Sequence, residues 1–305
     1  MRPFLTRLQL HKSGTNALLL GLLLGMGAYK SESRLNEKPA RSLVLDTPNL
    51  VAFWDFQDRT GSHRVDKSRN RFRLREVGGI VERIRPEDGA PFGKFAADLK
   101  FPQRFELPRA EMGALNIHGK TAQVSVVAWI RRRKVWEHGK PTHANEAIAG
   151  VWREQDHKRQ YCLFLNIKTN MKMMPKQTDE KVSGHVSGTG GASTGQPWCY
   201  EVSLGATPVP WDEWVCVGLT YDGRAIRSYF NGVFDAAEGY NPYEQPEGIF
   251  DGGPGGADFV VGHSDVKRQA NNQFVGVLGG VAVFDRALTG AEMRKLAEPI
   301  FGLKK

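Results

Sequence analysis

The sequence predicts an all-β protein, a sandwich of antiparallel strands, and three observations lead to this fold class. Glycine accounts for 34 of the 305 residues, about 11% where about 7% is usual, so turns are plentiful. Short runs rich in Val, Ile, Phe, Tyr and Trp recur along the chain, and Gly, Pro, Asn and Asp separate them. Hydrophobic residues make up 40% of the chain, which is enough for a packed core and excludes a disordered chain.

Nine runs have the composition of strands. Asp222-Gly223 and Asn231-Gly232 separate consecutive runs, and both dipeptides readily adopt the positive φ of tight hairpins. The segments that they connect are therefore expected to form a three-stranded meander. The nine runs are LVAFWDF (50–56), RFRLREV (71–77), QVSVVAWI (123–130), AIAGVW (147–152), YCLFLNI (161–167), WVCVGLTY (214–221), AIRSYF (225–230), DFVVG (258–262) and VGVLGGVAVF (275–284).

One short helix is predicted, near the end of the chain. Thr289 and Glu292 have the spacing of a capping box, in which a hydroxyl and a carboxylate cap the first turn reciprocally. Met293 and Leu296 then provide an apolar face before Pro299.

The N-terminal segment 1–28 has the layout of a signal peptide. Its first 12 residues carry three basic residues and no acidic one, and the 12 residues Ala17–Ala28 are apolar or small. A membrane-spanning helix needs about 20 apolar residues, so export with cleavage near Gly27 or Ala28 is expected. A retained anchor, which has the same charge pattern, is the alternative. The mature protein is expected to be secreted, periplasmic or on the cell surface, with no membrane span.

A polar linker is predicted over residues 29–47 and one large domain over 48–300, because β-sandwiches of about 200 to 250 residues fold as single units. Charge is uneven along the mature chain, with 26 basic and 17 acidic residues in 29–160 but 13 and 16 in 161–305. This asymmetry favours an acidic partner, such as a sulfated or uronic polysaccharide, a lipid headgroup or a teichoic-type polymer. The export signal argues against nucleic acid.

Every second residue from 69 to 75 is an arginine, and the period of two would place all four on one face of a strand. Such a ladder could bind an anionic glycan, because guanidinium groups pair bidentately with carboxylate or sulfate. The alternative is a solvated outer face that guards a sheet edge against aggregation. The four residues are Arg69, Arg71, Arg73 and Arg75.

Two long glycine-rich segments, 169–197 and 236–258, are the places where a binding surface is expected. If they meet at one rim, His185 and Trp198 would face Tyr240 and Tyr243, and the aromatic rings would suit a neutral sugar. A loop histidine that only forms hydrogen bonds is the alternative for His185. Among the cysteines, Cys162 and Cys199 could form a disulfide if their strands are neighbours, whereas Cys216 lies in a buried run.

Several of these segments resemble a known family. The pattern W-x3-GLTYDG-x6-FNG from Trp214 to Gly232, and G-x-LGG-x-AVFDRALT-x-x-E after it, are similar to the laminin-G-like branch of the concanavalin A-like lectin/glucanase superfamily. The resemblance covers roughly residues 48–298. It implies a two-sheet antiparallel jelly roll that binds glycans or proteins and does not imply catalysis.

The sequence departs from this family at a position that can lie near calcium. Pro102 and Gln103 stand where many members have Asp-Gly, and no calcium-binding loop motif replaces it. No cofactor is therefore expected, and calcium would require Asp251, Asp258 and Asp265 to converge.

The catalytic motifs are incomplete. Glucanases of the same superfamily use E-x-D-x-x-E, but Glu154 and Asp156 are followed by Arg159 at the third position, which favours a solvated hairpin turn. The G-x-S-x-G match at 191–195 lacks the helix that a nucleophile elbow requires. The histidines show no zinc-like spacing.

The sequence thus predicts an exported, non-catalytic binding or adhesion module for a glycan or an anionic cell-surface polymer. A polysaccharide hydrolase or lyase, with carboxylates contributed by loops, is the second hypothesis. A structural component of an exported complex, with a protein partner, is the third.

Overall fold

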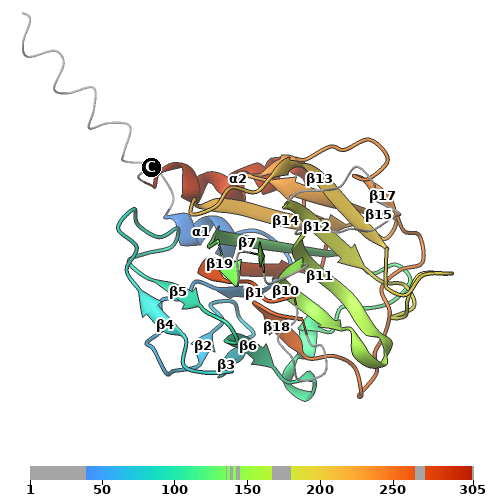
Figure 1. Cartoon of the computed structure of the whole chain (residues 1–305), viewed down its shortest axis with the longest axis horizontal. Coiled ribbons are helices and arrows are strands. Elements are labelled where there is room, and N and C mark those ends of the chain that lie inside the picture. The colour runs from blue at the N-terminus through green and yellow to red at the C-terminus, as the bar shows by residue number, and fades with distance from the viewer. Residues whose placement is uncertain are drawn as a thin grey trace, which may run out of the picture. The chain divides into compact units, whose positions relative to one another are not determined.

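The computed structural model describes residues 39–134, 136–137, 140–141, 145–166, 180–264 and 272–303. The predicted signal peptide lies outside these residues, and residues 40–303 belong to one folded unit. This unit is a sandwich of two large antiparallel sheets, which confirms the predicted fold class (Figure 1).

The first sheet has nine strands, in the order β16-β15-β14-β7-β19-β5-β4, with β1 paired to β19 and β17 to β15. The predicted meander is confirmed here, because Asn231 and Gly232 both have positive φ in the turn between β15 and β16. The strands are β1 (Leu50–Trp54), β4 (Glu82–Ile84), β5 (Ala96–Leu99), β7 (Val124–Arg132), β14 (Val215–Tyr221), β15 (Ala225–Phe230), β16 (Val233–Phe234), β17 (Tyr243–Glu244) and β19 (Gly276–Phe284).

The second sheet has eight strands in the order β13-β12-β11-β10-β18-β6-β3-β2. A separate hairpin pairs β8 (Trp136–Glu137) with β9 (Lys140–Pro141), and single 3-10 turns η2 (Arg109–Glu111), η3 (Gly113–Leu115) and η4 (Gln155–His157) lie in connections. The strands are β2 (Arg64–Val65), β3 (Arg73–Val77), β6 (Arg104–Leu107), β10 (Asn145–Arg153), β11 (Lys158–Asn166), β12 (Lys181–Val186), β13 (Val202–Pro208) and β18 (Phe259–Val261).

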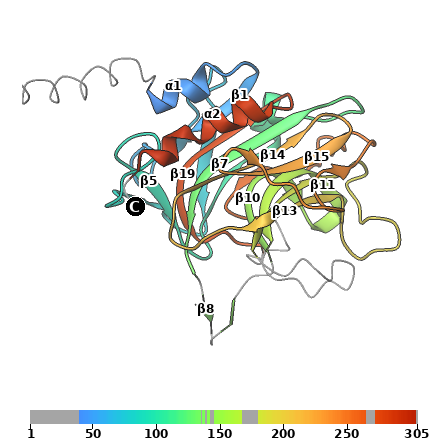
Figure 2. The ribbon, with the colours of Figure 1, turned by 90° about the horizontal axis from the view of Figure 1, so that it is seen from above.

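Two helices cover the outer face of the nine-stranded sheet, and they lie beside each other in Figure 2. Helix α2 (Gly290–Phe301) has the predicted capping box at Thr289 and continues through Pro299. Its Leu296 packs with the sheet residue Trp129, whose indole Nε1 donates to the Leu296 carbonyl at 2.8 Å. Neither this helix nor any other in the described ranges is long and apolar enough to cross a membrane.

The described end of the expected linker is folded. Ala40–Leu45 forms helix α1, with Val44 buried in the same cluster as α2. The linker expectation therefore differs from the structure over these six residues, because so short a helix shows no recognisable apolar period in the sequence.

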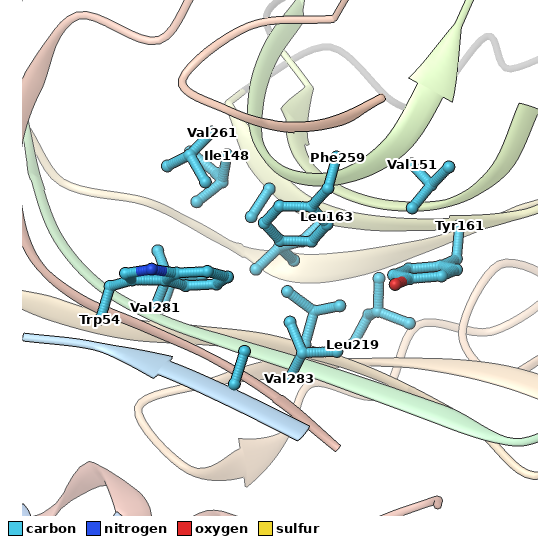
Figure 3. Packing of buried hydrophobic residues seen from close by; sticks show 14 of the residues in the cluster. Trp54, Ile148, Val151, Tyr161, Leu163, Leu219, Phe259, Val261, Val281 and Val283 are labelled. Atoms are coloured by element: carbon cyan, nitrogen blue, oxygen red, sulfur yellow. The ribbon is translucent and has the colours of Figure 1, made fainter. Parts of the chain in front are cut away.

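The main core lies between the two sheets (Figure 3). Alternate residues of facing strands enter it, as the period of two predicts. Trp54 stacks on Phe259 with ring centroids 5.4 Å apart, and Val281 and Val283 of β19 pack in the same cluster. Trp54 and Trp129 are fully buried, as expected, and Trp214 is partly buried.

The two ends of this core are closed by different chemistry. At the end where β7 stops and β10 starts, which we call the charged end, buried Arg132 of one sheet pairs with buried Glu146 of the other at 3.1 Å. Arg132 also pairs with Glu180 at 3.3 Å and stacks over the Trp211 ring at 3.5 Å. Burial raises the pKa of Glu146 to about 7, although Arg132 opposes the rise.

At the opposite end, where β10 turns into β11, two buried tyrosines close the core, and we call it the tyrosine end. The Tyr161 hydroxyl donates to the Leu115 carbonyl at 2.7 Å. The Tyr221 hydroxyl lies 2.7 Å from both the backbone oxygen and Oε1 of Gln245 and accepts from the Gly248 amide at 3.2 Å. These bonds attach the connecting segments around 115 and 245–248 to the sheets.

Candidate functional site

The two glycine-rich segments meet at the tyrosine end. The Phe250 amide donates to the Ser187 carbonyl at 2.8 Å. A Cβ atom on Gly188 would lie 2.4 Å from Cβ of Glu247, and one on Gly190 would lie 2.6 Å from the Phe250 ring. The close approach of the two segments therefore requires glycine at both positions.

The first segment is shorter than the sequence suggests, because its part KVSGHV forms strand β12, which lies between β13 and β11 in the eight-stranded sheet. The expectation that this part is a loop is wrong. Gly184 faces the core, where a Cβ atom would lie 2.8 Å from Cβ of Leu219, so the glycine reflects tight packing and not a turn. Residues 169–179 lie outside the described residues.

His185 is a strand residue on the outer face of that sheet. Its ring packs edge-on against Trp152 and Phe164, with centroid distances of 5.3 and 4.9 Å. Burial, with a smaller contribution from Arg159, lowers the pKa of His185 to about 3, so the ring is neutral at ordinary pH. The structure therefore places His185 in an aromatic cluster and not on a mobile loop.

Trp198 lies on the connection between β12 and β13, and its side chain is 54% exposed. Ser193 closes this loop, because its amide donates to the Trp198 carbonyl at 3.0 Å and its Oγ accepts from the Tyr200 amide at 2.8 Å. The serine of the G-x-S-x-G match thus has a structural role. The next residue, Cys199, is buried and anchors the loop in the cluster of Trp152 and Phe164.

Tyr240 and Tyr243 both lie beside this loop. Tyr240 packs with Tyr200 against Val202 and Leu204, and its carbonyl accepts from the Leu204 amide at 3.1 Å. Tyr243 is in β17 and packs against the main core, where burial, Glu201, Cys199 and Glu247 raise its pKa. Tyr200 was missed by the sequence analysis, although it stands two residues after Trp198 and directly before β13.

Glu154 and Arg159 fix the hairpin beneath the loop. Arg159 is buried and binds Glu154 Oε2 with Nε at 2.8 Å and Nη2 at 2.7 Å, while Glu154 Oε1 accepts from the Trp152 indole at 2.7 Å. Arg159 also donates to the Gly190 carbonyl at 3.3 Å. The predicted turn is present, with Asp156 inside η4, but Arg159 and Glu154 are not solvated as expected, because their ion pair packs beneath the first glycine-rich segment.

The disulfide considered possible between Cys162 and Cys199 is not formed, and the cysteines of the described chain are free and buried. In the sheet register Cys162 stands between Gly150 and His185, while Cys199 belongs to the overlying loop. Burial raises the pKa of Cys199 to about 12 and that of Cys162 well above its usual value, so both are protonated thiols.

The acidic residues considered for calcium are engaged elsewhere. Asp258 accepts from the Arg109 amide at 2.7 Å, and Asp251 lies 3.5 Å from the Arg109 guanidinium and 3.6 Å from His118. Asp265 lies outside the described residues. Within the described ranges no three His, Cys, Asp or Glu side chains are grouped so that they could hold a metal ion.

The predicted arginine ladder is not a single strand face. Arg69 and Arg71 precede β3, and Arg71 has a φ of 57°, so only Arg73 and Arg75 belong to the strand. Nevertheless all four side chains are exposed. Arg75 pairs with Glu111.

This sandwich of two antiparallel sheets, in which two glycine-rich segments meet at one end of the core, has a lectin-like β-sandwich architecture. Residues 110–294, more than half of the chain, match the laminin G family described as the concanavalin A-like lectin/glucanases superfamily. The chain belongs to this family.

Solved structures share the fold at low sequence identity. Domain 4 of AbnA, a GH43 extracellular arabinanase from Geobacillus stearothermophilus in complex with arabinotriose, is 18% identical over 82% of this chain and 98% of that domain, with a TM-score of 0.52. The CBM40 of a Ruminococcus gnavus IT-sialidase, bound to α2,3-sialyllactose, is 12% identical over 68% of this chain and all of that module, with a TM-score of 0.45. No curated protein matches the sequence.

Proposed function

We propose that this protein is an exported, non-catalytic glycan-binding module whose ligand stacks on Trp198. One observation carries the proposal: a tryptophan ring that is 54% exposed stands on a loop closed by Ser193 and anchored by buried Cys199. An exposed flat ring that is fixed in position is suited to stacking against the apolar face of a sugar. The arabinotriose complex of the arabinanase domain supports an oligosaccharide as the class of ligand.

The surroundings of Trp198 supply the polar groups that orient a sugar. Tyr200 and Tyr240 lie half-buried beside the loop, and Glu201 fixes the Gly188 amide through Oε2 at 3.0 Å. Binding would therefore involve little rearrangement, because the loop is held by bonds that exist before the ligand arrives.

Stacking on Trp198 is tested with a panel of neutral polysaccharides in 0.5 M salt, where binding to exposed charge is screened. We expect wild-type protein to bind at least one of them and Trp198→Ala to bind it at least tenfold more weakly, with unchanged thermal stability. Phe301→Ala, which removes another exposed aromatic ring (65% exposed) from α2, is the matched control and should bind normally. Equal affinity of the wild type and Trp198→Ala, or no binding to any neutral polysaccharide, would contradict the proposal.

Absence of catalysis is tested separately by measuring sugar release from the same panel. Release that is abolished by one Asp or Glu substitution would favour the hydrolase or lyase hypothesis.

Export is tested by sequencing the N-terminus of the mature protein, which should begin near residue 28 or 29. A protein partner that copurifies from the native cell, together with no glycan binding, would favour the structural hypothesis.

A further inference from the structure

The segment before β3 is built so that its arginines point outward. Just before the arginines, buried Asp66 accepts from the amides of Phe53 and Ser68, both at 2.7 Å. The Ser68 hydroxyl and the Asn70 side-chain amide donate to the Val51 carbonyl at 2.9 and 2.8 Å. These contacts tie alternate residues to β1, and Leu74 continues the inward series in the main core.

The outward series is Arg69, Arg71, Arg73 and Arg75, which we call the arginine row. Side-chain hydrogen bonds replace the sheet ladder in the turn, where Arg69, Asn70 and Arg71 are all exposed, and the alternation of a strand begins at Arg73. The row is fixed to the sandwich, so its guanidinium groups emerge from an ordered backbone and not from a flexible tail.

Three members of the row carry uncompensated charge. Within the described part of the chain, Arg69, Arg71 and Arg73 have no acidic or aromatic partner, whereas Arg75 pairs with Glu111. Other arginines of the protein have carboxylate partners that neutralise their charge: Arg64 pairs with Glu76 at 2.8 Å and Arg159 with Glu154. Three exposed, unpaired arginines within five residues concentrate positive charge in the half of the chain that is rich in basic residues.

We propose that the arginine row binds a linear acidic polysaccharide, through its sulfate or carboxylate groups. Guanidinium groups pair with both anions in bidentate geometry. Arg73 and Arg75 are two residues apart on a strand, so their Cα atoms are separated by roughly 7 Å. Arg69 and Arg71 lie on the turn that leads into this strand, so the exposed row offers several guanidinium contacts to a polymer with repeating anions. A single small ion would engage only one member.

This site is independent of the Trp198 loop. The loop joins β12 to β13, the row leads into β3, and four strands (β11, β10, β18 and β6) lie between β12 and β3. At about 4.8 Å per strand the two surfaces are roughly 24 Å apart across the sheet. The proposal for the arginine row can therefore be correct even if the proposal for Trp198 is wrong, and the reverse also holds.

The experiment compares the wild type with two charge-matched triple variants of the full chain. The row variant is Arg69→Gln/Arg71→Gln/Arg73→Gln. The control variant, Arg85→Gln/Arg224→Gln/Arg294→Gln, removes three exposed arginines from a connection, a turn and helix α2. Binding to heparin, polygalacturonate and inorganic polyphosphate is measured at 0.05, 0.15 and 0.5 M salt, and thermal melting confirms that each variant is folded.

We expect the wild type to bind heparin or polygalacturonate, and the row variant to bind roughly tenfold more weakly at low salt, while the control variant stays within about twofold. The triple Lys variant of the row should be intermediate, because lysine keeps the charge but loses bidentate geometry. Equal losses of polymer binding in the two Gln variants would show that the polymers are attracted only by the net charge of the protein, and this would overturn the proposal. Binding to polyphosphate only, or to none of the three polymers, would also overturn it.

Discussion

The two ends of the core are closed by different kinds of side chain, which are charged at one end and neutral at the other. At the charged end, Arg132 and Glu146 bridge the sheets as a buried ion pair, and Glu180 shares the same guanidinium. At the tyrosine end, Tyr161 and Tyr221 use neutral hydroxyl groups, and burial raises the pKa of Tyr221 to about 12. The difference indicates that stability at the charged end responds to pH near neutrality, while the end that carries the proposed glycan site does not.

The largest expected effect is the loss of Arg132. Arg132→Met should reduce the free energy of unfolding at pH 8 by about 3–5 kcal/mol, because it leaves the Glu146 carboxylate buried without its partner. At pH 5 the cost should be smaller, since the carboxyl can then take up a proton. Urea denaturation at both pH values measures the two costs, and equal values would show that Glu146 does not carry the charge at pH 8.

Glu146→Gln is expected to have an intermediate effect, on how the free energy of unfolding depends on pH. The pKa of Glu146 is raised to about 7, so the folded state holds the proton more tightly than the unfolded state. Stability from this group is therefore fully present below about pH 4.5 and is lost as the pH rises through about 7, by about 3 kcal/mol in total. The Gln variant cannot titrate and should lack this part of the pH dependence. Parallel stability curves of the variant and the wild type from pH 4.5 to 8 would refute this assignment.

The smallest effect is expected at the tyrosine end. Tyr221→Phe should reduce the free energy of unfolding by about 1–2 kcal/mol, because the Gly248 amide and Gln245 lose a buried partner. The loss should be the same at pH 5 and pH 8, as no charge is involved. Tyr229→Phe is the matched control, since its hydroxyl has no hydrogen-bond partner in the described structure, and it should cost less than about 0.5 kcal/mol.

Local sequence patterns were sufficient to predict those parts of the fold that depend on neighbouring residues alone. The runs that became β14 and β15, the turn at Asn231-Gly232 and the cap at Thr289 were all predicted, because composition, positive φ and a hydroxyl cap are local properties. The family resemblance added the two-sheet arrangement, which the strand pattern alone does not distinguish from other β architectures.

The site was predicted less well, because its geometry depends on contacts that are distant in sequence. KVSGHV was assigned to a loop because glycine weakens strands, but Leu219 and Ile226 from the other sheet fill the space that Gly184 leaves. The ladder was predicted as a strand, but the contacts of Asp66, Ser68 and Asn70 with β1 hold its first half in a turn, where Asn70 is exposed beside the arginines.

Helices α1 and α2 pack together over the nine-stranded sheet, so the first and last described segments of the folded unit lie on the same face. The Trp198 loop and the arginine row both continue strands of the other sheet. Immobilisation of this unit through either terminus on a sensor chip, a bead or a carrier would consequently orient both proposed recognition surfaces toward the solution.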